Sequence, residues 1–258
     1  MSGLSVVIIT LNEEKNLDRC LRSIVRIADE IVVVDSGSTD RTIEIAHRYH
    51  AKIFTEPFRG YVAQKNFADA CASHDWILSI DADEALSPEL DTAIRQIKGN
   101  EKHDAYEVKR LTNYCGKWIR HCGWYPDKKI RLFHRQKGKW SGEQIHESWQ
   151  PHPSSSSIGQ LSGDLLHYSY YTLSDHLKQI EKFTEIMARR DVANGKNSTL
   201  WYAIASAHWK FIQSYILQLG VLDGAAGFQV CKLSAFATYM KYSKIRQYYQ
   251  FNKEGKPY

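Results

Sequence analysis

The feature that most constrains the fold is the regular alternation of short apolar runs with helix-like segments over the first hundred residues. Apolar runs typical of buried strands cover residues 4–10, 30–34, 52–55 and 76–80. Helical periodicity fills the intervals, as in residues 61–71, and continues over residues 88–97. This alternation predicts an α/β fold, with a mainly parallel sheet and helices on both of its faces.

Polar side chains follow three of these predicted strands, at the point where each strand ends. Thr10 ends the first strand, Asp35 follows the second and Asp81 follows the fourth. The carboxyl ends of parallel strands lie at one edge of a sheet, and ligands bind beyond that edge. We therefore expect these three residues to line one crevice, because helix capping alone would not require polar groups at three strand ends.

The loop after the fourth strand carries two carboxylates, Asp81 and Asp83, separated by one residue. Carboxylates are preferred ligands of hard divalent cations, so this loop predicts that Mg²⁺ or Mn²⁺ bridges the protein to a bound diphosphate. The alternative is a solvated turn with helix-capping carboxylates, because an Asp-x-Asp sequence is common by chance.

Four motifs, in this order along the chain, resemble those of the family 2 inverting glycosyltransferases, which have the GT-A fold. They are Thr10–Glu14, Val34–Asp40, Gln64–Asn66 and Trp76–Glu84. The resemblance implies a metal-dependent enzyme. It also implies that Asp81 contacts the ribose or the metal and that Asp83 binds the metal. The residues that would hold the nucleotide, usually UDP, are Thr10, Asn12, Glu14, Asp35 and Lys65.

Later motifs give a narrower resemblance. They are Trp124–Asp127, Arg131–Phe133, Gly142–Glu147 and Leu166–Tyr168. These motifs are similar to those of the bacterial lipopolysaccharide-core β-1,4-glucosyltransferases that act on the first heptose. This resemblance implies that glucose moves from UDP-glucose to a hydroxyl of an inner-core heptose, in an acceptor that is linked to lipid A.

An inverting transfer needs a general base for the acceptor hydroxyl. We predict Glu147 as this base, because the family often places an acidic residue after the metal motif, and Asp127 is the alternative. This chain has His146-Glu147 where many relatives have Glu-Asp. Arg131 is a candidate for binding the diphosphate or an acceptor phosphate. His167, like His146, is a candidate for orienting a substrate, or else a structural histidine.

The second half of the chain differs from the first in charge and in periodicity. Residues 1–100 carry 11 Lys and Arg against 16 Asp and Glu, whereas residues 101–258 carry 23 against 13. We predict a catalytic domain over residues 1–150, followed by a linker and a helical region over residues 151–258. Helical periodicity covers residues 172–194, 199–218 and 223–249.

The aromatic and basic residues of this helical region predict contact with an anionic membrane surface, or else packing on the catalytic domain or on another subunit. The chain has five scattered cysteines, no apolar leader and no apolar run of bilayer length. We therefore expect a cytoplasmic protein that associates peripherally with the inner face of the cytoplasmic membrane. The basic residues are dispersed and no nucleic-acid motif is present, so we expect no nucleic-acid partner.

Three other functions agree with parts of the sequence. A polyprenyl-phosphate sugar transferase would use a lipid phosphate as nucleophile and would need no strong base. A nucleotidyltransferase shares the sheet and the metal chemistry, although a Gly-rich basic loop is missing after the first strand. A non-catalytic module that binds nucleotide-sugars would bind the donor without turnover.

Overall fold

The computed structural model describes residues 3–142, 147–152 and 157–256. The chain forms two compact units. One comprises residues 1–111 and 126–168, and the other comprises residues 112–125 and 169–258. The predicted division at residue 150 stays a prediction, and residues 153–156 of the predicted linker lie outside the described residues.

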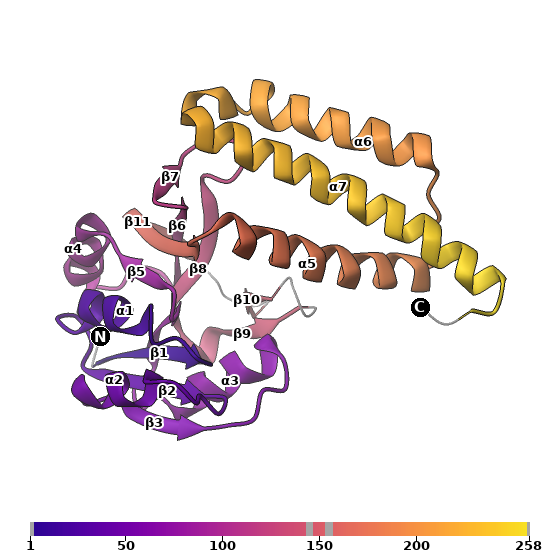
Figure 1. Cartoon of the computed structure of the whole chain (residues 1–258). Helices are drawn as coiled ribbons and strands as arrows, with labels where there is room; N and C mark the ends of the chain where they lie inside the picture. The colour runs from indigo at the N-terminus through magenta and orange to yellow at the C-terminus, as the bar shows by residue number, and fades with distance from the viewer. Residues whose placement is uncertain (1–2, 143–146, 153–156, 257–258) are drawn as a thin grey trace. The chain divides into compact units, whose positions relative to one another are not determined.

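Within the described residues, the strands form a nine-stranded sheet and a separate two-stranded sheet. The parallel part of the large sheet has the order β3-β2-β1-β4. Figure 1 labels the first three of these strands. The four strands are β1 (Leu4–Thr10), β2 (Glu30–Asp35), β3 (Lys52–Thr55) and β4 (Trp76–Asp81). Their bounds agree with the predicted apolar runs to within one residue.

Beyond β4, the large sheet continues in order with β8 (Asp127–His134), β6 (Ala105–Tyr114), β11 (Ile158–Tyr170) and β5 (Glu84–Leu86), with β7 (Lys117–Ile119) paired to β6. The sheet changes there to antiparallel pairing, because β4 pairs with β8 and β8 pairs with β6 in antiparallel directions. The small sheet comprises β9 (Gly138–Ser141) and β10 (Ser148–Pro151), and a short 3₁₀ turn, Arg135–Lys137, precedes β9. The first half of the sheet is therefore parallel and the second half mostly antiparallel.

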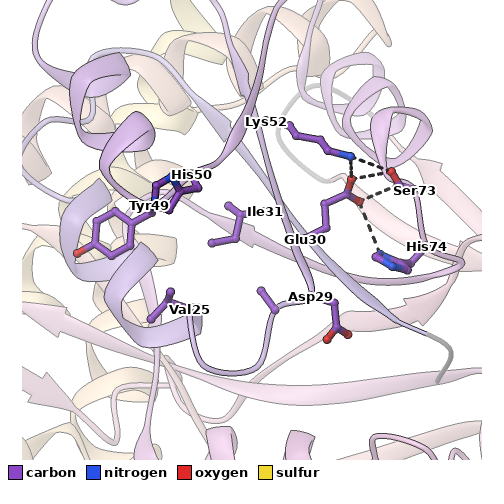
Figure 2. Close-up of a pocket in the computed structure, with 10 residues that line it drawn as sticks. Val25, Asp29, Glu30, Ile31, Tyr49, His50, Lys52, Ser73 and His74 are labelled. Atoms are coloured by element: carbon purple, nitrogen blue, oxygen red, sulfur yellow. Dashed lines mark hydrogen bonds and ion pairs between the residues drawn. The ribbon is translucent and has the colours of Figure 1, made fainter.

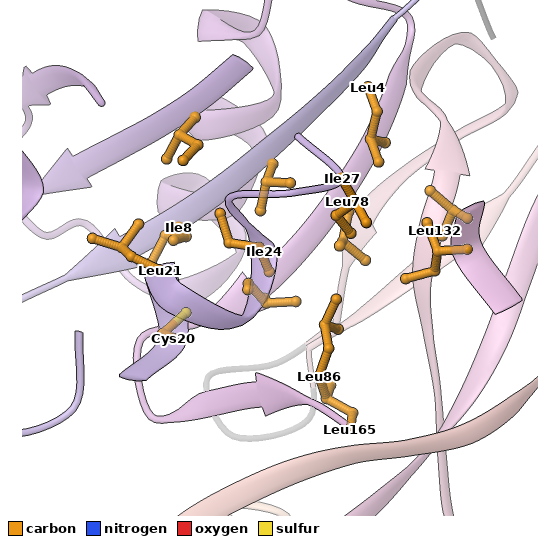
Figure 3. Packing of buried hydrophobic residues seen from close by; sticks show 14 of the residues in the cluster. Leu4, Ile8, Cys20, Leu21, Ile24, Ile27, Leu78, Leu86, Leu132 and Leu165 are labelled. Carbon is orange, nitrogen blue, oxygen red and sulfur yellow. The ribbon is translucent and has the colours of Figure 1, made fainter. Parts of the chain in front are cut away.

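Helices cover both faces of the parallel strands. They are α1 (Leu17–Ile24), α2 (Thr42–Arg48), α3 (Tyr61–Cys71) and α4 (Pro88–Ile97). Successive residues of a strand point to opposite faces, so Ile8 packs with α1, α2 and α4, whereas its neighbour Val7 packs with α3, β9 and β10. Figure 3 shows the first of these clusters, in which Leu21 of α1 lies beside Ile8. The predicted α/β fold is confirmed.

Strand β11 was not predicted from the sequence. Its glycines, Gly159 and Gly163, interrupt the apolar pattern that would have indicated a strand. Gly163 has a φ of 89°, and a Cβ atom there would lie 2.3 Å from the amide nitrogen of Leu90. The strand therefore needs glycine at this position to pass the beginning of α4.

The second unit contains the three predicted C-terminal helices. They are α5 (Leu173–Ala193), α6 (Leu200–Ile212) and α7 (Gly224–Lys253), with a π turn, Gln213–Leu217, and a 3₁₀ turn, Gly220–Asp223, between the last two. Thr172 and Asp175 form a capping box that begins α5. Helices α6 and α7 pack against each other in antiparallel directions, because Tyr202 contacts Tyr242 while Tyr215 contacts Phe228. Among the described residues, no helix is long and apolar enough to cross a bilayer.

Helix α3 carries a buried carboxyl group, Asp69, whose Oδ1 atom has no hydrogen-bond partner among the described residues. Burial raises the pKa of Asp69 to about 8, even though Lys65 and Arg135 act to lower it. The folded protein therefore keeps a proton on Asp69 at neutral pH, whereas the unfolded chain loses it near pH 4. Stability must fall as the pH rises from the unfolded to the folded pKa.

We expect Asp69→Asn to remove this pH dependence, because asparagine keeps the shape without the charge. Between pH 5 and pH 7, wild type should lose about 1.4 kcal/mol of unfolding free energy per pH unit relative to the variant. Urea unfolding of both proteins at several pH values measures this difference. Parallel stability profiles for wild type and variant would contradict the raised pKa.

Candidate active site

The parallel register brings the polar strand ends level with one another. Thr10 lies opposite Asp35 in the pairing of β1 with β2, and Ile9 lies opposite Asp81 in the pairing of β1 with β4. The Thr10 hydroxyl donates a hydrogen bond to Asp35 Oδ1 over 3.0 Å. The other oxygen of Asp35 accepts the backbone N–H groups of Gly37 and Ser38, each at 2.8 Å. Asp35 is thereby fixed at the carboxyl edge of the sheet.

Two other predicted nucleotide ligands, Asn12 and Glu14, join the loop after β1 to the loop after β2. The Asn12 side-chain oxygen accepts the N–H of Thr39 at 2.9 Å, and the Asn12 N–H donates to the Ser38 hydroxyl at 2.8 Å. Asn12 has a φ of 56°, a conformation that asparagine tolerates better than most residues. Glu14 Oε2 accepts the N–H of Arg41 at 3.2 Å. These side chains tie together the two loops beside the predicted crevice.

Asp81 lies between two buried cations. Lys65 Nζ is 2.8 Å from its Oδ1, and an Nη of Arg131 is 2.7 Å from its Oδ2. The same Nη of Arg131 lies 2.7 Å from Glu84 Oε1, while the other oxygen of Glu84 accepts the N–H of Asp81 at 2.9 Å. Burial alone would raise the pKa of Asp81, but Arg131 and Lys65 hold it well below its usual range. Asp81 therefore remains ionised in the folded protein.

Helix α3 positions Lys65 through the residues on either side of it. The Gln64 side-chain amide donates to the Ser36 hydroxyl at 3.1 Å, which ties the helix to the end of β2. Asn66 exchanges two hydrogen bonds with the backbone of Trp140 in β9, at 3.0 and 3.1 Å. The Trp140 ring in turn lies 4.6 Å from Lys65 Nζ. The motif Gln64–Asn66 thus joins the two sheets around the lysine.

Asp83 faces a histidine from a distant part of the chain. Its Oδ2 lies 3.2 Å from Nε2 of His167, which pairs with Glu84 in the register of β11 with β5. Burial acts to raise the pKa of Asp83, but His167 brings it below its usual value. From the sequence alone, His167 is a candidate for orienting a substrate or a structural histidine, because nothing local links it to a residue 84 positions earlier.

The two candidate bases have different surroundings. Glu147 Oε1 lies 3.8 Å from Lys65 Nζ, which places it beside Asp81. Asp127 pairs with Arg110 at 2.7 Å and with Lys129 at 3.2 Å. His146 lies outside the described residues.

Metal binding at this site would depend on few protein ligands. Among the described residues, no group of three or more histidine, cysteine, aspartate or glutamate side chains is arranged to hold a metal ion. Asp83 and His167 form a pair, and both oxygens of Asp81 already contact cations. Such a site suits a cation that takes its remaining ligands from substrate phosphates and water.

Trp124, from the motif Trp124–Asp127, belongs to the core of the second unit. Its ring packs against Tyr114, Tyr170 and His176, with ring centroids 5.7 to 6.0 Å apart. Burial lowers the pKa of His176 to about 4, so this histidine is neutral at pH 7. The contacts of Trp124 thus give it a packing role within this unit.

A pocket of about 330 Å³ lies at the opposite, amino end of β2 (Figure 2). Within it, Glu30 pairs with Lys52 at 2.5 Å and accepts hydrogen bonds from Ser5 and Ser73. Burial acts to raise the pKa of Glu30, but these partners lower it to about 2. Because Glu30 is satisfied by protein groups at the amino end of its strand, this pocket is not the crevice that the fold prepares for a ligand.

Comparison with known proteins identifies relatives over nearly the whole chain. The sequence model of Glycosyl transferase family 2 matches residues 5–152. An uncharacterised glycosyltransferase of Rickettsia typhi is 31% identical over 256 residues, which cover 96% of this chain and 88% of the relative. The lipopolysaccharide core biosynthesis glycosyltransferase LpsC of Rhizobium meliloti is 31% identical over 263 residues, which cover 95% of this chain and 92% of LpsC.

Solved structures give lower similarity. TarS 1–349 of S. aureus in complex with UDP-GlcNAc has a TM-score of 0.46 at 15% identity, over 99% of this chain and 93% of that chain. Glucosyl-3-phosphoglycerate synthase of Mycobacterium tuberculosis, in complex with Mn²⁺, UDP-glucose and phosphoglyceric acid, has a TM-score of 0.36 at 28% identity. That match covers 44% of each chain.

We expect Arg131→Met to destabilise the protein by about 3–5 kcal/mol, because it deprives the buried Asp81 and Glu84 of a shared cation. Chemical denaturation measures this loss. Arg22→Met is a matched control, since Arg22 also pairs with a carboxylate, Asp18, at 2.6 Å but on an exposed helix surface. Equal stabilities of the two variants would contradict the structural role of Arg131.

Proposed function

The chain belongs to glycosyltransferase family 2, and on this premise we propose that it transfers glucose from UDP-glucose to a hydroxyl of a lipopolysaccharide inner-core heptose, with inversion at the anomeric carbon. Its α/β domain has the GT-A fold. The observation that carries the proposal is the position of Lys65, whose Nζ lies 2.8 Å from Asp81 and 3.8 Å from Glu147. One buried cation thus holds the donor-side carboxylate beside the proposed base.

The donor nucleotide would occupy the edge formed by the ends of β1, β2 and β4. Asp35 Oδ1 and the Thr10 hydroxyl, already hydrogen-bonded to each other, offer polar atoms for the base or ribose. Gly37, with a φ of 98°, lets the backbone approach the nucleotide closely. Asn12 and Glu14 support the loops around it. Arg131 contacts carboxylates in this structure. We propose that it also contacts a phosphate of the donor diphosphate or of the acceptor.

A divalent cation, Mg²⁺ or Mn²⁺, would be held by Asp83 together with the donor diphosphate. Asp83 is the better placed of the two loop carboxylates, because its Oδ2 contacts the ring of His167, at 3.2 Å, rather than a buried lysine or arginine. Both oxygens of Asp81 contact cations, so Asp81 suits a ribose hydroxyl or a metal-bound water. When bound, the cation supplies positive charge that stabilises the leaving diphosphate.

The acceptor side of the reaction needs a group that removes a proton. We propose that Glu147 accepts the proton of the acceptor hydroxyl as its oxygen forms a bond to the anomeric carbon and the bond to UDP breaks. Lys65 would orient Glu147 through their pairing at 3.8 Å. Asp127 suits this role less well, because Arg110 and Lys129 neutralise its charge.

The lipopolysaccharide acceptor is proposed from two arguments. LpsC, a lipopolysaccharide core biosynthesis glycosyltransferase, is similar to this chain over 92% of its own length. Residues 101–258 also carry a net excess of ten basic residues, which suits a phosphorylated acceptor. Because such an acceptor is anchored by lipid, we propose that the enzyme works at the inner face of the cytoplasmic membrane.

We expect UDP-glucose binding to require a divalent cation and to depend on Asp83. Calorimetry should show binding with Mn²⁺ that is lost in EDTA, and Asp83→Ala should weaken it at least about tenfold, since carboxylates are the protein ligands that such cations prefer. Asp91→Ala, which removes a partly exposed carboxylate of α4, is the control and should bind as wild type does. Equal binding in Mn²⁺ and EDTA would overturn the metal site.

We expect Glu147→Gln to lower kcat by about 100-fold or more while leaving UDP-glucose affinity unchanged, because it removes the base and not the donor site. Asp127→Asn serves as the comparison and should retain more activity. A larger loss of kcat in Asp127→Asn than in Glu147→Gln would identify Asp127 as the base instead. Full turnover by both variants would exclude both carboxylates as the base and favour an acceptor with a phosphate nucleophile.

A further inference from the structure

The outward side of helix α6 is apolar, where a surface helix of a soluble protein normally carries charge. Trp201, Trp209 and Ile212 are exposed over 80%, 58% and 42% of their surface. Ile216, in the π turn that follows, is 58% exposed. Their spacing places these side chains along one side of the helix. Lys210 is the one charged residue between positions 200 and 222.

The turn between α6 and α7 extends this apolar side. Its exposed residues are Leu217, Leu219, Val221 and Leu222, each open over at least half of its surface. Leu219 has a φ of 55°, which a leucine seldom adopts. The backbone of Leu219 is therefore in an unfavourable conformation while its side chain points outward. Burial of that side chain within this unit does not offset the cost of the conformation.

Helix α7 completes the surface from the other side. Phe228, Lys232 and Phe236 are exposed and lie one helical turn apart on one face. The Phe228 ring packs edge-on against Phe211 and Tyr215, with centroids 5.9 and 5.7 Å apart. These contacts hold the beginning of α7 against the end of α6, so Phe228 lies next to the apolar side of α6. We call the exposed apolar residues of α6, α7 and the turn between them the apolar surface, comprising Trp201, Trp209, Ile212, Ile216, Leu217, Leu219, Val221, Leu222, Phe228 and Phe236.

The charges around the apolar surface have one sign. Residues 200–253 contain six Lys and Arg, and Asp223 is their one acidic residue. Asp223 is buried, and its carboxylate accepts the backbone N–H of His121 at 2.8 Å. Among the described residues, neither Lys210 nor Lys232 forms an ion pair. A partner of this surface therefore needs an apolar interior and a negative outer layer.

We propose that the apolar surface inserts into the interfacial layer of an anionic lipid bilayer. Tryptophan and aliphatic side chains enter the boundary between headgroups and acyl chains, while Lys210 and Lys232 contact lipid phosphates. A second copy of the chain would place the same basic residues against each other, so charge complementarity favours lipid. The inference rests on the proposed function for its purpose, because insertion would bring the enzyme to a lipid-anchored acceptor.

Co-sedimentation of the full-length protein with lipid vesicles tests the proposal. The probes are vesicles of phosphatidylcholine alone and vesicles that also contain phosphatidylglycerol. Wild type should bind the anionic vesicles, less so at high salt, and the triple variant Trp209→Ser, Leu217→Ser, Leu222→Ser should bind at least about tenfold more weakly. The matched control is Leu177→Ser, which removes a leucine of α5 that is 40% exposed and should bind as wild type does.

Tryptophan fluorescence reports insertion directly, because Trp201 and Trp209 lie in the apolar surface. Their emission should shift to shorter wavelength with anionic vesicles in wild type and in Leu177→Ser. Equal vesicle binding by the triple variant, or equal binding to neutral and anionic vesicles, would overturn the proposal. The proposal would also be overturned if wild type formed a dimer and did not bind vesicles, while the triple variant was a monomer. That result would show that the apolar surface binds a second copy of the chain.

Donor binding separates this inference from the proposed function. The triple variant should bind UDP-glucose as wild type does, because none of its substitutions lies in the unit that holds the candidate active site. Vesicle binding by a wild-type protein that does not bind UDP-glucose would support insertion and contradict the proposed donor. A wild-type protein that binds UDP-glucose but not vesicles would support the proposed donor and contradict insertion.

Discussion

The pairing of Asp81 with Lys65 and Arg131 is the interaction on which the candidate site depends. It joins the end of β4 to helix α3 and strand β8, at 2.8 and 2.7 Å, in a buried position. Buried ion pairs add little net stability, because removing the charges from water costs about as much as their attraction returns. Their effect here is positional. The two cations fix where the loop that carries Asp83 leaves the sheet, and Lys65 also pairs with Glu147.

The rest of the site is built on the rigidity of the parallel strands. The register that sets Thr10 opposite Asp35 and Ile9 opposite Asp81 places three strand ends at one level. Loops that leave this edge are then tied to each other by side chains, as Asn12 ties the first loop to the second. A donor would meet groups that are already oriented, which lowers the entropy cost of binding and of reaction.

The second unit has a different physical character. Its helices bury their aromatic residues against each other, yet α6 and the turn after it expose apolar side chains and almost no charge. A surface of this composition is unfavourable in water unless something covers it. The sequence predicted a membrane, the catalytic domain or another subunit as the partner of these helices, and the exposed positions of the tryptophans and leucines favour the lipid surface that we propose.

The sequence by itself determined the α/β fold and the polar strand ends, because apolar periodicity and strand-end chemistry are local properties that a chain shows without folding. Strand β11 was not predicted, since Gly163 serves a close approach to α4 that the sequence does not display. Only the tertiary structure decided that Asp81 would be held by Lys65 and Arg131, and that His167 would face Asp83. Those partners lie 16, 50 and 84 residues apart, and pairing over such distances is set by sheet register and helix packing rather than by local sequence.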